Sequence, residues 1–318
     1  MRKRIAYLDS AKAILILLVI FGHIYKISDI SFLDVQSKYR EYFLIRDWVY
    51  SFHMPAFFIL SGITLKTDKP FSLYVVQKIK RLLIPYFIAE IVSAILLITV
   101  CGYKKLTLTD YLINFLLLRS STIVNWFLIT LFFAEIFVFG LKKNHMAFKL
   151  GFAVLAVIFT YYCTFSYPLL FMGRIAISSM YILLGTEIKD ILDKLIEYKF
   201  LLVWGLISAV SYVHLTNVDL YYGQLSHPVF YVLGSISGTM IVVTVAKIAN
   251  NKIFEWIGRN TLTIMITHML IILFVQGRIN PPLTYFNMTF YYFVVLIVEC
   301  LIIIMYGKIK KSNKRIIH

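Results

Sequence analysis

The chain alternates between long apolar stretches and short polar segments, and this alternation limits its possible folds more than any other feature. Ten stretches are long enough to be helices that cross a bilayer. They lie at roughly 11–27, 48–66, 82–101, 126–141, 147–165, 168–187, 199–214, 228–247, 261–276 and 288–307. Hydrophobic residues make up 60% of the 318 positions. The pattern predicts an all-α, polytopic integral protein of the cell membrane, with one membrane domain over residues 1–318.

The distribution of basic residues predicts the orientation of these helices. The chain has 32 Lys and Arg against 16 Asp and Glu, a formal charge of +16. If the amino terminus is cytoplasmic, the inner segments hold 22 of the 32 cations and the outer segments hold eight. The positive-inside rule therefore places both termini in the cytoplasm. The basic carboxyl-terminal tail is then expected to contact anionic lipid of the bilayer, and no nucleic-acid partner is predicted.

The remaining sequence features indicate that any catalytic or binding chemistry comes from polar residues within the apolar stretches. Cys101, Cys163 and Cys300 are scattered and form no disulfide framework or metal motif, so no metal is expected. A short apolar run at 111–118 is expected to be re-entrant or interfacial. Ionisable residues inside a membrane are costly, and this cost makes them candidates for a functional site.

The first apolar stretch carries Lys12 at its start and His23 near its end. Eleven residues are three helical turns plus about 20°, so both side chains leave the same face, about 16 Å apart in height. An alternative for Lys12 is a lysine at the membrane surface that pairs with Asp9. An alternative for His23 is a neutral histidine bonded to a neighbouring helix.

His53, Arg174 and His268 also lie within predicted membrane helices. His53 and Arg174 are expected at nearly the depth of His23, so the three predict one buried polar chamber. Arg174 needs a carboxylate or an anionic ligand at that depth. Pro55, close to His53, frees a backbone carbonyl one turn earlier, although the two can also form a simple packing kink. His268 lies near the middle of the ninth stretch.

A basic cluster precedes the third predicted helix. Lys78 and Arg81 share a helical face, and Lys80 lies between them. They can be ordinary positive-inside residues. Together with Lys12 they also offer a phosphate-rich cytosolic ligand several cations at the mouth of a membrane cavity.

Several ordered motifs resemble membrane acyltransferase family 3. They are LDSAK with Lys12 ahead of His23, SFHMPAFFILSG, KIKRLLIPY, Asn125-Trp126-Phe127-Leu128, and IGRNTLTIMITH. The first two are most similar to the fucose 4-O-acetylase-like branch, which includes polysaccharide O-acetyltransferases. Many members of the family have Arg at the position of Lys12, and a lysine lacks the bidentate guanidinium fork.

The resemblance implies a ten-helix O-acyltransferase that moves an acyl group, usually acetyl, from cytosolic acyl-CoA to a sugar hydroxyl of a surface glycan. His23 is the expected catalytic residue, as general base or as a transient acyl carrier. The donor acetyl-CoA is expected at Lys12, Lys78, Lys80 and Arg81. The carbohydrate acceptor is expected near His53, Asn125, Trp126, Arg174 and His268.

A transporter or flippase for a glycan or a small solute is the alternative function. Its intramembrane His and Arg residues form a substrate or proton pathway. The chain shows no repeated halves and no pair of broken helices, and both absences favour the enzyme.

Overall fold

The structure is a computed structural model that describes residues 5–28, 30–66, 68–100, 107–119, 124–164, 166–216 and 218–316. Within these ranges every regular element is a helix, and the predicted all-α fold is confirmed. Cys101 and the amino-terminal residues 1–4, for which a cytoplasmic position is predicted, lie outside the described residues.

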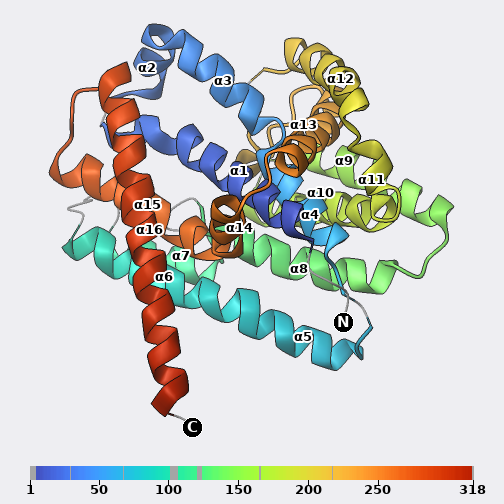
Figure 1. The fold of residues 1–318 in the computed structure, drawn as a ribbon, viewed down its shortest axis with the longest axis horizontal. Helices are drawn as coiled ribbons and strands as arrows, with labels where there is room; N and C mark the ends of the chain where they lie inside the picture. The colour runs from blue at the N-terminus through green and yellow to red at the C-terminus, as the bar shows by residue number, and fades with distance from the viewer. Residues whose placement is uncertain are drawn as a thin grey trace.

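The helices follow one another along the chain, with short turns between most of them (Figure 1). The α-helices are α1 (Ala6–His23), α2 (Phe32–Lys38), α3 (Arg40–Tyr50), α4 (His53–Ile63), α5 (Phe71–Lys78), α6 (Ile84–Thr99), α7 (Leu108–Leu116), α8 (Trp126–Leu141), α9 (Met146–Tyr162), α10 (Tyr167–Ile188), α11 (Leu192–Leu195), α12 (Leu201–Val213), α13 (Pro228–Ile248), α14 (Lys252–Arg259), α15 (Thr261–Arg278) and α16 (Tyr285–Ile316). Shorter 3₁₀ or π segments are η1 (Ile24–Ile27), η2 (Ile79–Leu83), η3 (Tyr198–Phe200) and η4 (Leu220–Tyr222). The run predicted at 111–118 corresponds to α7.

Six helical stretches of the described chain are long and apolar enough to cross a membrane. They are Ala6–Ile27, Phe71–Thr99, Tyr167–Ile188, Pro228–Ile248, Thr261–Arg278 and Tyr285–Lys308. Three shorter apolar helices are Trp126–Leu141, Met146–Tyr162 and Tyr198–Val213. These helices are those of a membrane protein. The count of ten crossings and the cytoplasmic position of both termini remain predictions.

The prediction of one continuous helix over 48–66 is wrong. The chain turns at Ser51 and Phe52, between α3 and α4, and α4 has only 11 residues. Pro55 lies in the first turn of α4 and has no N–H to donate to the Ser51 carbonyl. That carbonyl instead accepts a hydrogen bond from Ser235 Oγ on α13, at 2.8 Å. The Ser51 carbonyl therefore lacks a backbone donor at Pro55, and it accepts a hydrogen bond from the neighbouring helix α13 instead.

The third predicted helix, 82–101, begins eleven residues too late. One continuous stretch of 29 residues runs over Phe71–Thr99. It passes through the π-helical segment η2, which ends two residues before Pro85. Because Pro85 cannot donate a backbone hydrogen bond, a locally wider helix accommodates it without ending the element.

α1 lies within the bundle and packs against α3, α4, α13, α14 and α15 (Figure 1). Two glycine contacts set the closest approaches between helices. A Cβ atom at Gly62 of α4 would lie 2.0 Å from the Ile182 carbonyl oxygen of α10. A Cβ atom at Gly258 of α14 would lie 1.8 Å from the Asp9 carbonyl oxygen of α1. These glycines allow the backbones to touch, as in other membrane helix pairs.

Candidate active site

One cavity lies beside Lys12 and a second lies beside His23, near opposite ends of α1. Lys12 lines a cavity of about 690 Å³, named here the cationic cavity. His23, the last residue of α1, lines a second cavity of about 640 Å³, named here the histidine cavity. The helical rise between the two residues is about 16 Å. One straight helix therefore joins a cationic site to a histidine site.

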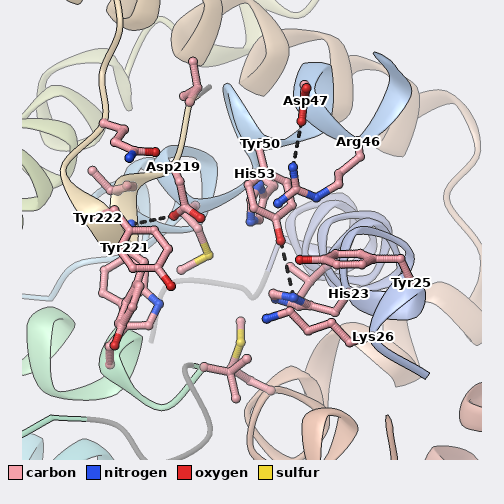
Figure 2. Close-up of a pocket in the computed structure, with 18 of the residues that line it drawn as sticks. His23, Tyr25, Lys26, Arg46, Asp47, Tyr50, His53, Asp219, Tyr221 and Tyr222 are labelled. Carbon is pink, nitrogen blue, oxygen red and sulfur yellow. Dashed lines mark hydrogen bonds and ion pairs between the residues drawn. The ribbon is translucent and has the colours of Figure 1, made fainter. Parts of the chain in front are cut away.

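The histidine cavity has two facing walls (Figure 2). His23, Lys26 and Tyr50 lie on one wall, together with Tyr25, Arg46 and His53. The facing wall carries Asp219, Tyr221 and Tyr222 from η4 and the residue before it. Trp126 at the start of α8 also lines the cavity. The walls combine hydrogen-bonding groups with aromatic rings, a composition suited to a sugar.

His23 contacts the phenol of Tyr50. The Tyr50 hydroxyl oxygen lies 3.3 Å from His23 Nδ1 and 3.4 Å from the Gly22 carbonyl oxygen. The hydroxyl can donate to Gly22 while it accepts the Nδ1 proton of His23. In that tautomer Nε2 of His23 keeps its lone pair, as a general base requires.

His53 and His268, two of the predicted acceptor residues, both lie close to this pair. The His53 ring centroid is 4.7 Å from that of Tyr50, and the His268 ring centroid is 5.7 Å from that of His23. Each Nδ1 lies within 2.9 Å of the carbonyl oxygen four residues earlier and donates to it, which leaves Nε2 as an acceptor. Nε2 of the fully buried His268 has no hydrogen-bond partner in the described part of the chain.

Arg46 was not predicted as a site residue, because the expected second helix began after it. Its side chain is buried on α3. The guanidinium carbon lies 3.9 Å from the ring centroid of Tyr50, and Nη1 lies 2.7 Å from Asp47 Oδ1. A cation over the ring face at this distance is a favourable cation–π contact. Arg46 therefore holds Tyr50 in place beside His23.

The loop with Asp219 was also missed, since no periodic pattern or motif marks it. Asp219 and Gln224 form an isolated antiparallel bridge, and Gly223 between them has φ +68°. Asp219 Oδ1 accepts the backbone N–H of Tyr221 at 2.8 Å. Burial raises the pKa of the Asp219 carboxyl, while this hydrogen bond and the charges of Arg46, Lys26 and Arg174 oppose the rise. The closed loop fixes both tyrosines on the cavity wall.

Two predicted acceptor residues lie behind the cavity wall. Asn125 is fully buried, and its Nδ2 donates to Glu90 Oε1 at 2.9 Å. Arg174 is 1% exposed, and its guanidinium carbon lies 4.2 Å from the ring centroid of Tyr221. No carboxylate of the described residues lies within 4 Å of Arg174, so the carboxylate partner considered from sequence is absent there. The rings of Trp126 and Tyr167, at 5.5 and 5.8 Å, complete its surroundings.

The cationic cavity contains three of the four predicted donor cations. Lys12, Lys78 and Arg81 line it, and sequence analysis missed Lys66 and Lys189, which line it as well. Lys80 is exposed and is not one of the lining residues. Two carboxylates, Asp9 and Asp190, also contribute to the lining. The net charge of the ionisable side chains that line this cavity is therefore positive.

Two of these lysines have carboxylate neighbours. Lys78 forms an ion pair with Glu135 of α8, whose side chain is buried. Lys12 Nζ lies 3.9 Å from Asp9 Oδ1, so the pairing considered from sequence is present while Lys12 also lines the cavity. Asp9 Oδ2 lies 3.7 Å from Arg259 Nε. Through Asp9 and Gly258, the LDSAK and IGRNT motifs pack α1 against α14.

Comparison with known proteins identifies the family. The family model described as an acyltransferase domain, of acyltransferase family 3, matches residues 5–307. No curated protein and no solved structure matches the chain. The matched region includes both cavities and all of α1. The chain therefore belongs to acyltransferase family 3 and is a membrane acyltransferase.

Proposed function

We propose that this protein is an O-acyltransferase that moves an acetyl group from acetyl-CoA to a hydroxyl of a cell-surface or exported glycan. The observation that carries the proposal is the position of the two cavities along α1. The cationic cavity adjoins Lys12, and the histidine cavity adjoins His23. Donor and acceptor can thus approach His23 from opposite directions.

The cationic cavity supplies charges suited to the phosphates of the donor. Lys12, Lys78 and Arg81 are joined by Lys66 and Lys189, so phosphate oxygens meet cations from four parts of the chain. The pantetheine arm of CoA is comparable in length to the rise of about 16 Å between Lys12 and His23. We expect the phosphates to remain in the cationic cavity while the thioester reaches His23.

His23 is the proposed catalytic residue. As a general base, its Nε2 takes the proton of the sugar hydroxyl while the hydroxyl oxygen attacks the thioester carbonyl. The carbon–sulfur bond then breaks, and CoA leaves as a thiol with the proton from His23. In the alternative route, Nε2 attacks the thioester carbonyl, the carbon–sulfur bond breaks and CoA leaves as a thiolate. The sugar hydroxyl then attacks the acetyl-imidazole, and its proton neutralises the CoA thiolate. Both routes require an unprotonated Nε2, which donation from Nδ1 to Tyr50 provides.

The acceptor is proposed to bind between the two walls of the histidine cavity. Trp126, Tyr221 and Tyr222 provide ring faces for a sugar, and His53 provides a polar group. Asn125, Arg174 and His268 act through these residues, since they lie behind the lining.

Transfer of labelled acetyl from acetyl-CoA to a glycan acceptor by the purified protein tests the proposal. His23→Ala should abolish transfer and leave donor binding and folding intact. His214→Ala is the matched control, because His214 stacks on Phe230 and does not line the cavity. Full transfer by folded His23→Ala protein would contradict the proposed role.

A further inference from the structure

Lys26 brings a positive charge into the histidine cavity. It lies in η1, three residues after His23, and its ammonium group points into the space between the two walls (Figure 2). Nζ lies 5.9 Å from the ring centroid of Tyr25. Across the described ranges, no carboxylate oxygen lies within 4 Å of this nitrogen. The mechanism proposed above does not use Lys26.

The charges of the described residues around the cavity do not balance. Arg46 is paired with Asp47, and Lys26 faces Asp219 from the opposite wall. Arg174 adds a third cation behind Tyr221. Among the residues that the structure describes, three cations therefore meet two carboxylates, an excess of one positive charge. Further out, Arg119 over the Tyr167 ring and Glu90 beside Asn125 add one charge of each sign.

An uncompensated charge in a poorly solvated site is costly, and a ligand of opposite charge removes that cost. One carboxylate has the charge that balances this excess, whereas the phosphate of a monoester carries about −1.5 to −2 at neutral pH. A lysine is a single point charge and suits a monoanion. Asp219 on the facing wall accepts hydrogen bonds, as from sugar hydroxyls.

This inference rests on the proposed function and specifies its acceptor. We propose that the acceptor is an acidic sugar whose carboxylate binds Lys26, while its hydroxyls face Asp219. The two walls then orient the sugar, because its charged group and its hydroxyls meet opposite charges. The hydroxyl that is acetylated lies on the side of the ring that faces His23.

Matched acceptor pairs test the inference on the purified full-length protein. Each pair consists of the nitrophenyl glycosides of a hexuronate and its parent hexose, from the gluco, galacto and manno series. Hexose 6-phosphate glycosides form a third arm, which distinguishes a carboxylate from a phosphate. The measurement is kcat/KM for acetyl transfer. Lys26→Met removes the charge and keeps most of the stem, Lys26→Arg keeps the charge, and Lys38→Met is the control at an exposed position of α2.

We expect at least one hexuronate to exceed its parent hexose by roughly ten- to a hundredfold, the usual effect of a hydrogen bond to a charged group. Lys26→Met should lower transfer to that hexuronate at least tenfold more than transfer to its parent hexose, and Lys26→Arg should retain the preference. Equal or better use of the hexoses, or of the phosphates, contradicts the acidic-sugar acceptor and leaves the proposed function standing. Equal loss on all acceptors in Lys26→Met also overturns it. Transfer to no member of the panel contradicts both proposals.

Discussion

The hydroxyl oxygen of Tyr50 lies 3.3 Å from Nδ1 of His23, at the end of the helix that also carries Lys12. Arg46 stacks on the ring of the same tyrosine at 3.9 Å. Tyr50 therefore connects a buried cation to the imidazole. This contact fixes which ring nitrogen of His23 faces a partner and which remains open to substrate.

Tyr50→Phe should reduce kcat for acetyl transfer by roughly two- to tenfold, the worth of one ordinary hydrogen bond. The ring and its contact with Arg46 remain in this variant, so donor affinity and the thermal unfolding temperature should change little. Tyr42→Phe is the matched control, because the Tyr42 hydroxyl donates to the Phe21 carbonyl at 2.6 Å and not to a histidine. An equal loss of kcat in both variants would count against a positioning role for Tyr50.

Removal of charge from the cationic cavity should weaken donor binding. We expect Lys12→Gln and Lys66→Gln each to raise the Kd for acetyl-CoA by roughly ten- to a hundredfold, if each lysine contacts a phosphate. Lys12→Arg should retain binding, since it keeps the charge. Lys80→Gln removes a charge of the same sign from an exposed position outside the lining. A Kd raised equally by Lys80→Gln would indicate long-range attraction and no defined site.

Gly62→Ala should destabilise the fold. Its Cβ would lie 2.0 Å from the Ile182 carbonyl oxygen, so α4 and α10 must move apart. Overpacking of this kind costs about 1–3 kcal/mol. Gly140→Ala is the control, because a Cβ there meets no atom within 4 Å. Thermal unfolding in detergent should show a lower midpoint for Gly62→Ala only; equal midpoints would show that the helix contact is looser than described.

The sequence predicted the helices better than the walls of the site. Long apolar runs fix α8, α10 and α13 to within a residue or two, because lipid demands continuous apolar surface. The break at Ser51 depends on Ser235, which lies 184 positions later, and no local pattern reveals such a partner. Arg46 and Asp219 were missed for the same reason, since only the tertiary fold brings the two segments that carry them to one cavity.

The most direct test of the central claim is acetyl transfer in sealed vesicles of known orientation, with labelled acetyl-CoA supplied on one side and glycan acceptor on the other. Label should appear on the acceptor when the donor is at the cytoplasmic face, CoA should stay on the donor side, and His23→Ala should abolish the labelling. Movement of unmodified glycan or solute across the membrane without acetyl-CoA, with no labelled acceptor on either side, would contradict the account and favour a transporter.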